Sequence, residues 1–187
     1  MGKRSNFERK ERDFYPTPLK AVLPVVPYIK RFSPNPSCTF IEPCAGDGSL
    51  IDILEERGLA CTAACDIEPR RNDISTKNAL DLTESDCNGQ FIITNPPWER
   101  SILHEMIPHF TALRPTWLLF DADWLFTLQS EPYLHLLKKV VAVGRVKWIP
   151  DSKSQGKDNA SWYYFDKKIK KDIHFVNFFG RNDLNNP

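Results

Sequence analysis

Apolar segments of strand length alternate with segments of helical period along most of the chain. Strands are expected where β-branched, aromatic and other apolar residues follow one another, and helices where apolar residues recur every three or four positions. On this basis we expect strands over 39–41, 60–65, 91–94 and 117–120, and helices over 49–57, 101–113 and 131–139. Such alternation predicts an α/β fold with a mostly parallel sheet and crossover helices.

The pattern changes near residue 140. Two further apolar runs, 140–149 and 162–165, flank the polar segment 151–160, and 174–179 resembles one more strand. Two strands joined by a polar loop predict an antiparallel hairpin rather than another crossover. We therefore expect the C-terminal part of the sheet to be antiparallel.

Composition narrows the class of protein. The 187 residues are 41% hydrophobic and 26% charged, which predicts one globular domain over 13–180, with a flexible basic N-terminus (1–12) and a flexible tail (181–187). No apolar run approaches the roughly 20 residues of a membrane span, and the polar start does not fit a signal peptide. The five cysteines and four histidines show no ligand spacing, so we expect no metal and a reduced, cytoplasmic protein.

The formal net charge of +1 hides a strong segregation of charge. Residues 1–41 carry +5 and residues 138–171 carry +7, whereas residues 42–99 carry −8. Basic ends around an acidic middle are expected if the ends face a polyanion and the middle holds a cationic or hydroxyl-rich ligand. The alternative is a solvated surface on which the charges scatter without a partner.

A glycine-containing turn follows the first predicted strand. Its sequence is Glu42-Pro43-Cys44-Ala45-Gly46-Asp47-Gly48, and Asp66 ends the next strand, 18 positions beyond Gly48. The two glycines permit a tight turn and a close ligand approach, but the third small residue of a dinucleotide fingerprint and the Lys of a phosphate loop are absent. A carboxylate such as Asp66 can accept both hydroxyls of a ribose, and Glu42 can attract an ammonium. S-adenosylmethionine, a nucleoside with a positively charged tail, is a ligand that these two carboxylates could bind. The alternative is that this segment is only a turn and binds no ligand.

A second turn, Asn95-Pro96-Pro97-Trp98, directly follows the strand predicted over 91–94. The side-chain oxygen of Asn95 and the carbonyl of Pro96 can each accept one N–H of an exocyclic amine, which localises the nitrogen lone pair for attack on a methyl donor. Pro96 and Pro97 hold that carbonyl at a fixed angle, and Trp98 offers a flat face for a planar substrate such as a flipped base. The alternative is a rigid strand-end turn with a core tryptophan.

With these two turns and the segment Asp13-Phe14-Tyr15-Pro16-Thr17-Pro18, the chain resembles the class I S-adenosylmethionine-dependent methyltransferases. Within them it is similar to small DNA adenine-N6 methyltransferases of the kind that bacteriophages carry. The resemblance runs from about Asp13 to Phe179, in the motif order of the gamma arrangement. It implies a Rossmann-like, seven-stranded sheet whose last strand is antiparallel, and a host-cell cytoplasmic location if the protein is phage-encoded.

The resemblance also implies roles for individual residues. Tyr15 and Thr17 would contact the methionine end of the cofactor, and Gly46 to Gly48 would pass beneath it. Glu42, Pro43, Ala45 and Asp47, in the same turn, are further cofactor-binding candidates. Asp66 would hold the ribose, Ile67 would pack on the adenine, and Asp81 stands where an adenine-amine acceptor usually lies.

Two departures from the family pattern bear on the substrate. Trp98 stands where Tyr or Phe is more frequent, and only 28 residues separate Asp66 from Asn95, which leaves no room for a target-recognition domain. Recognition of a particular target sequence in the nucleic acid would then depend on a loop of this chain or on a partner. The loop 151–160 carries Lys153 and Lys157 and is followed by Trp162, which would stack on a base; core packing is the equal alternative for Trp162.

The sequence thus predicts an enzyme that transfers a methyl group from S-adenosylmethionine to the exocyclic N6 of adenine in DNA. The same turn serves adenine or guanine amines in RNA and glutamine side chains in proteins, so those activities are alternatives. A catalytically inactive module that binds nucleic acid or a partner is an alternative of another class. The expected partners are DNA and either a homodimer mate or a subunit that supplies target recognition.

Overall fold

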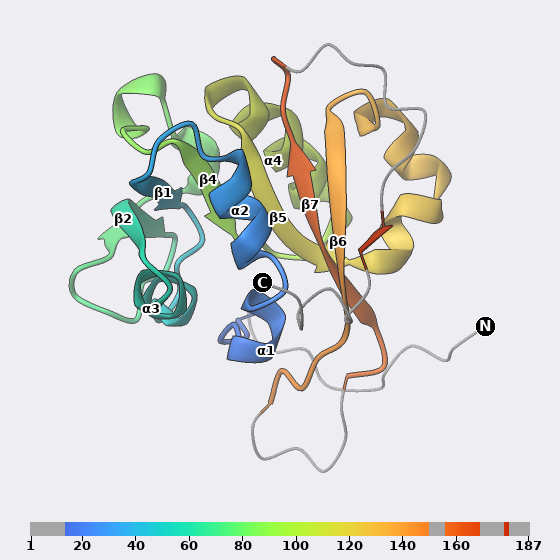
Figure 1. Ribbon diagram of the computed structural model, residues 1–187, viewed down its shortest axis with the longest axis horizontal. Helices are drawn as coiled ribbons and strands as arrows, with labels where there is room; N and C mark the ends of the chain where they lie inside the picture. The colour runs from blue at the N-terminus through green and yellow to red at the C-terminus, as the bar shows by residue number, and fades with distance from the viewer. Residues whose placement is uncertain (1–13, 150–155, 169–177, 180–187) are drawn as a thin grey trace.

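The computed structural model describes residues 14–149, 156–168 and 178–179, which form one sheet with helices on both faces (Figure 1). Eight strands follow the order β3-β2-β1-β4-β5-β7-β6-β8. Their bounds are β1 Cys38–Glu42, β2 Leu59–Asp66, β3 Ser75–Thr76, β4 Phe91–Thr94, β5 Thr116–Asp121, β6 Leu137–Arg145, β7 Asn159–Phe165 and β8 Phe178–Phe179. Among these strands β7 alone runs antiparallel to its neighbours, β5 and β6.

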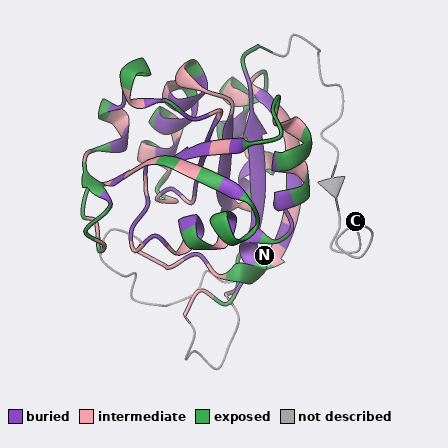
Figure 2. Ribbon diagram, turned by 60° about the vertical axis from the view of Figure 1, so that its left-hand side comes forward, coloured by how far each residue is buried: buried purple, intermediate pink, exposed green. Residues whose placement is uncertain are grey.

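The central strands are buried on both faces, which explains why their sequences are continuous apolar runs. All four residues of β4 and the first five of β5 are buried, as Figure 2 shows for the middle of the sheet. By contrast β2, nearer the edge, alternates between buried and more exposed positions. Consecutive residues of each central strand therefore contribute to two separate cores, one on each face.

Different helices cover the two faces. Helices α1 (Leu19–Val22), α2 (Val26–Phe32) and α3 (Ser49–Glu56) pack on one face, where Ile29 and Leu54 join Phe40 and Trp117. Helix α4 (Arg100–Leu113) packs on the other face and contributes Ile107 to a cluster with sheet residues. Figure 1 shows α1 and α2 in front of the sheet and α4 behind it. Four 3₁₀ helices complete the described part: η2 Ala79–Asp81, η3 Glu84–Asp86, η4 Ala122–Phe126 and η5 Leu128–Tyr133.

Most elements expected from the sequence are confirmed. The four strands predicted in the first two thirds of the chain correspond to β1, β2, β4 and β5, and the two predicted helices there correspond to α3 and α4. The C-terminal antiparallel hairpin is confirmed as β6 and β7, which pair from Leu137 and Phe165 to Arg145 and Asn159. The predicted seven-stranded sheet is confirmed as β3-β2-β1-β4-β5-β7-β6, and a further short strand, β8, pairs with β6 in parallel.

Other expectations were wrong or lie outside the described residues. The helix predicted over 131–139 does not form, because 3₁₀ helix η5 ends at Tyr133 and β6 already begins at Leu137, where it pairs with β7. The strand predicted over 140–149 starts earlier and ends at Arg145. Of the strand predicted over 174–179 only Phe178–Phe179 is described, and the segments 1–12 and 181–187 lie outside the described residues.

Trp162 requires a correction. It stands in β7 with no exposed surface, and its indole N–H donates to the carbonyl of Ala21 over 2.8 Å. A ring enclosed in this way has no face on which a base could stack. Trp162 is a core residue that joins β7 to α1, as the alternative interpretation had it.

This position predicts a stability effect. Trp162→Phe removes the indole N–H, leaves the Ala21 carbonyl without its donor and creates a small void. We expect the free energy of unfolding to fall by about 2–3 kcal/mol, measured by urea denaturation. Trp148→Phe, at a half-buried position, is the matched control and is expected to cost less than about 1 kcal/mol. Equal losses for the two variants would contradict this assignment.

Candidate functional site

The ends of four parallel strands meet at one edge of the sheet. Glu42 ends β1, Asp66 ends β2, Asn95 follows β4 directly and Asp121 ends β5. In an open parallel sheet this carboxyl edge is where ligands bind. The four polar side chains that end or follow these strands therefore lie along a single edge of the sheet.

The turn after β1 is fixed by two hydrogen bonds to the end of β2 and by a third to the segment that follows β2. The amide of Ala45 donates to the carbonyl of Cys65 over 3.0 Å, and the amide of Gly46 donates to a carboxylate oxygen of Asp66 over 2.8 Å. The carbonyl of Gly46 in turn accepts from the amide of Arg70 over 2.9 Å. The turn and the segment that follows β2 thus form one rigid unit.

The two glycines of this turn are required by conformation and by space. Gly46 and Gly48 have φ values of +54° and +80°, which side chains other than glycine rarely adopt. A Cβ on Gly46 would stand 2.8 Å from the ring of Phe14, and one on Gly48 would collide with the guanidinium of Arg71. The space beside each glycine is thus taken by a protein side chain, whereas the sequence suggested a close ligand approach.

Glu42 is the most unusual group at this edge. Its side chain is 1% exposed, and its Oε2 atom has no hydrogen-bond partner among the described residues. Burial raises the pKa of Glu42 well above its usual range, and the nearby carboxylates of Asp66 and Asp47 raise it further, against an opposing effect of Arg71. A buried carboxyl group with an unpaired oxygen suits a ligand that carries a positive charge.

Asp66 and Ile67 lie next to this turn. One oxygen of Asp66 accepts from Gly46 and the other accepts from the amide of Glu68 over 2.8 Å, so the carboxylate is held in place. Each oxygen keeps a lone pair with which it could accept a hydroxyl. Ile67 is 57% exposed, an unusual state for a large apolar side chain, and is available to pack on a planar ligand.

The remaining cofactor candidates are distributed around the same edge. Asp47 accepts from the amide and the hydroxyl of Ser49, over 3.0 and 2.7 Å, and so fixes the start of α3. Pro43 and Ala45 are buried, Tyr15 is half-buried, and Asp81 is exposed at the end of η2. The roles expected for these residues stay predictions.

The turn after β4 is held by hydrogen bonds at both ends of the Asn95 side chain. Its Nδ2 atom donates to the hydroxyl oxygen of Thr17 over 3.2 Å, and its Oδ1 atom accepts from the indole N–H of Trp98 over 3.2 Å. Trp98 also donates to the carbonyl of Leu119, at 3.2 Å. Because Oδ1 has two lone pairs, one remains with which a substrate amine could pair. Pro96 is buried and Pro97 is half-buried.

Trp148 is a candidate that sequence reasoning missed. Its ring meets that of Trp98 edge to face, with centroids 5.5 Å apart. It also lines a cleft of about 370 Å³ with Pro16, Thr17, Pro18, Ser49, Asp52, Ile53 and Lys147. Trp148 had been assigned to the strand predicted over 140–149, but it stands past the end of β6, beside an exposed lysine. An aromatic residue next to a lysine at the end of a strand was the available signal.

The other substrate candidates are scattered. Lys157 is exposed just before β7, and Lys153 lies outside the described residues. Trp162 is in the core, as described above. The described side chains thus bring Trp98, Trp148 and Lys147 together, and they separate Trp162 from the site.

Nothing in the described part of the chain indicates metal or thiol chemistry. No group of three His, Cys, Asp or Glu side chains there could hold a metal ion. All five cysteines are free, and burial raises the pKa of each thiol, so thiolate reactivity is suppressed. A search of the same residues finds no helix with the length and apolar character needed to cross a membrane.

Comparison with known proteins identifies solved structures that share the fold of this chain. No protein-family model and no curated protein matches the chain. Among solved structures, a proposed class I S-adenosylmethionine-dependent methyltransferase from Listeria monocytogenes has a TM-score of 0.58 at 8% identity, over 87% of this chain and 64% of that one. A proposed RNA methyltransferase from Pyrococcus horikoshii has a TM-score of 0.59 at 12% identity, over 88% and 93%.

A third similar structure belongs to a DNA-modifying system. The methyltransferase subunit of a type I restriction-modification system from Streptococcus thermophilus has a TM-score of 0.54 at 10% identity, over 82% of this chain and 45% of that one. The chain thus spans about two thirds of the Listeria protein and under half of the Streptococcus subunit. At these identities the likeness concerns the fold, and the chain has the Rossmann-like class I methyltransferase fold.

The buried state of Glu42 predicts a pH-dependent stability. Because the folded state raises its pKa above the usual 4.5, the folded protein binds this proton more tightly than the unfolded chain. The stability therefore falls as the pH rises from about 4.5 towards the raised pKa. Glu42→Gln removes the ionisation, so its free energy of unfolding, relative to the wild type, should increase over that interval by about 1.4 kcal/mol per unit of raised pKa.

Urea denaturation at several pH values, without ligand, measures this difference. Glu56→Gln, at an exposed position of α3, is the matched control and should show no such increase. A Glu42→Gln variant that is less stable than the wild type at neutral pH would contradict the assignment of a buried, unpaired carboxyl group.

Proposed function

We propose that the protein transfers a methyl group from S-adenosylmethionine to the exocyclic N6 amine of adenine in DNA. The observation that carries this proposal is the hydrogen bond between Thr17 and Asn95. It joins the segment before α1 to the amide of the second turn, at the edge where Glu42 is buried. Because β1, which Glu42 ends, pairs with β4, which Asn95 follows, the carboxyl group proposed to bind a cation and the amide proposed to bind an amine stand at the ends of adjacent strands.

The residues present suit this cofactor. The unpaired Oε2 atom of Glu42 would receive the ammonium group, and the fixed carboxylate of Asp66 would accept the ribose hydroxyls. Ile67 would cover the adenine ring, and Asp81 would accept its amine. When bound, S-adenosylmethionine supplies a methyl group activated by an adjacent sulfonium charge.

The second turn is suited to bind and activate an amine. The free lone pair of Asn95 Oδ1 and the carbonyl of Pro96 would each accept one N–H, which draws the amine nitrogen out of conjugation with its ring. The hydroxyl oxygen of Thr17 accepts from Nδ2 and so keeps Oδ1 directed to the substrate. No strong general base is required for this role, because an amine loses its proton readily once it has been alkylated.

The aromatic and basic residues beside this turn favour a nucleic acid. Trp98 and Trp148 offer apolar walls for a base, and Lys147 adds a cation at the cleft that Trp148 lines. Lys157 lies exposed just before β7. Because an exocyclic amine inside a duplex is paired, the base must leave the stack to reach Asn95.

RNA is the second candidate substrate. The likeness to a proposed RNA methyltransferase from Pyrococcus horikoshii, over 88% of this chain, favours it. The likeness to the methyltransferase subunit of a type I restriction-modification system supports DNA, together with a partner subunit that supplies target recognition. The resemblance of Phe14-Tyr15-Pro16-Thr17-Pro18 to DNA adenine methyltransferases inclines the proposal to DNA.

The product identifies the substrate. The protein is incubated with labelled S-adenosylmethionine and, separately, with unmethylated genomic DNA, with RNA and with a protein extract, and each product is digested to nucleosides or amino acids. We expect label in N6-methyldeoxyadenosine. Label in a ribonucleoside or in methylglutamine would replace the DNA proposal, and no label in any fraction would overturn the enzyme proposal.

Asn95→Ala tests the amine-binding role. Loss of the amide should lower kcat by about 10²–10³-fold or more, while the affinity for S-adenosylmethionine, measured by calorimetry, stays close to that of the wild type. Loss of activity and of cofactor affinity together would contradict a role confined to the amine.

Thr17→Val tests whether the first segment orients Asn95. The variant keeps the side-chain shape but cannot accept from Nδ2, so we expect kcat to fall about tenfold with little change in the KM for S-adenosylmethionine. Thr17→Ser keeps the hydroxyl and should retain most of the activity. An unchanged kcat with a raised KM would show that Thr17 serves the cofactor instead.

A further inference from the structure

The backbone pairing between β4 and β5 ends just before the second turn. Thr94 is the last residue of β4 in the ladder, where it lies opposite Leu118. Beyond Asn95, Pro96 and Pro97 have no N–H with which the ladder could continue. The segment that leads from β4 into α4 therefore depends on side chains to hold it against β5.

Two side chains that follow the prolines make this contact. The indole N–H of Trp98 donates to the carbonyl of Leu119 over 3.2 Å. Arg100, the first residue of α4, forms an ion pair at 3.5 Å with the carboxylate of Asp121, the last residue of β5. The two contacts are two residues apart on both segments, so side chains take over where the backbone ladder stops.

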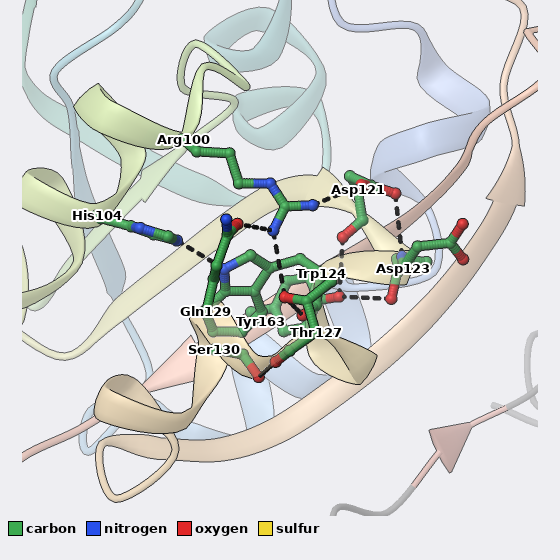
Figure 3. A network of polar contacts seen from close by, with 10 residues as sticks. Arg100, His104, Asp121, Asp123, Trp124, Thr127, Gln129, Ser130 and Tyr163 are labelled. Carbon is green, nitrogen blue, oxygen red and sulfur yellow. Dashed lines mark hydrogen bonds and ion pairs between the residues drawn. The ribbon is translucent and has the colours of Figure 1, made fainter. Parts of the chain in front are cut away.

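Arg100 also contacts the loop that follows β5 (Figure 3). Its guanidinium donates to the hydroxyl oxygen of Thr127 over 3.3 Å and to the side-chain oxygen of Gln129 over 3.1 Å. A planar guanidinium with five N–H donors is suited to bind several acceptors at once. One side chain thus joins the start of α4 to three acceptors, at the end of β5 and in the loop after it.

This loop is itself firmly held. Trp124 has no exposed surface, and its indole N–H donates to the Nε2 atom of His104 on α4 over 3.0 Å. The hydroxyl of Thr127 donates to the carbonyl of Trp124 over 2.8 Å, and the hydroxyl of Tyr163 donates to the carbonyl of Asp121 over 3.0 Å (Figure 3). The acceptors that Arg100 contacts are therefore a rigid support.

We propose that Arg100 is a positioning residue for methyl transfer, which fixes the second turn so that the Asn95 amide and the Pro96 carbonyl meet the substrate amine together. This inference rests on the proposed function. Only residues 96–99 separate Asn95 from Arg100, and the two prolines among them have a fixed φ. A displacement at Arg100 is thus passed on to the Pro96 carbonyl rather than absorbed, and an error of about 1 Å at a reacting group can cost about 10²-fold in rate.

Arg100→Gln tests this role. The single-turnover rate of methyl transfer is measured with saturating labelled S-adenosylmethionine and the acceptor that the wild type labels. We expect the rate to fall about 10–100-fold, with the affinities for cofactor and acceptor within about twofold of the wild type, because Arg100 orients the turn and touches neither. Arg100→Lys keeps the charge beside Asp121 without the fork to Thr127 and Gln129, so it should recover part of the rate.

His104→Ala is the matched control. It lies on the same helix and contacts the same loop, but it stands one turn further from the prolines and leaves the contacts of Arg100 intact. Loss of the acceptor for Trp124 should lower the urea midpoint of unfolding, as Arg100→Gln does, yet the transfer rate should stay that of the wild type. Stability and rate thus change together only if Arg100 serves the fold alone.

The contradicting outcomes are distinct. An Arg100→Gln rate equal to that of the wild type, or equal rate losses in Arg100→Gln and His104→Ala, would refute a positioning role. A weaker affinity for the acceptor with an unchanged rate at saturation would mean that Arg100 binds the substrate instead. In each of these cases the wild type still transfers methyl groups, so the proposed function stands. A wild type that labels no acceptor would refute both proposals.

Discussion

The site depends on a buried carboxyl group, that of Glu42, for which the described part of the chain provides no hydrogen-bond partner at one oxygen. Its Oε2 atom lies at the end of β1, and the nearby carboxylates of Asp66 and Asp47 add to the cost of ionising the group. Such an arrangement destabilises the folded chain at neutral pH, and a cationic ligand would offset the cost. Among the twelve carboxylates of the acidic stretch 42–99, which carries −8, only Glu42 is buried, so the ligand proposal depends on this residue and not on the stretch as a whole.

The parallel sheet turns this local feature into a site. Because β1, β2, β4 and β5 run in the same direction, their carboxyl ends bring Glu42, Asp66 and Asn95 to one edge. Hydrogen bonds then fix the relation between them: Gly46 to Asp66, Thr17 to Asn95, and Asn95 to Trp98. Few of these groups have freedom left to lose on binding, which favours both affinity and orientation.

Much of the fold, and the position of the two turns at the ends of β1 and β4, could be predicted for identifiable reasons. The central strands are buried on both faces and so read as continuous apolar runs, and the two turns stand directly after them. Helices α1 and α2 were missed because they are short and contain or adjoin prolines, and the helix over 131–139 was wrong because strand pairing overrode local pattern. The spacing of residues along the sequence could not show that Trp148 contacts Trp98 whereas Trp162 is enclosed in the core. Trp162 lies in β7, where every residue after Asn159 is buried, so no alternation of apolar and polar positions marks which side chains face the site.

The central claim is that this edge binds S-adenosylmethionine through Glu42, next to an amine-binding turn. Isothermal titration calorimetry of the wild-type protein with S-adenosylmethionine, in two buffers of different ionisation enthalpy, tests it most directly. We predict binding with release of a proton, because an ammonium favours the ionised form of a group whose pKa is raised, and we predict that Glu42→Gln binds more weakly without that release. Absence of binding to the wild type, or equal affinity and equal proton release in the variant, would contradict the account.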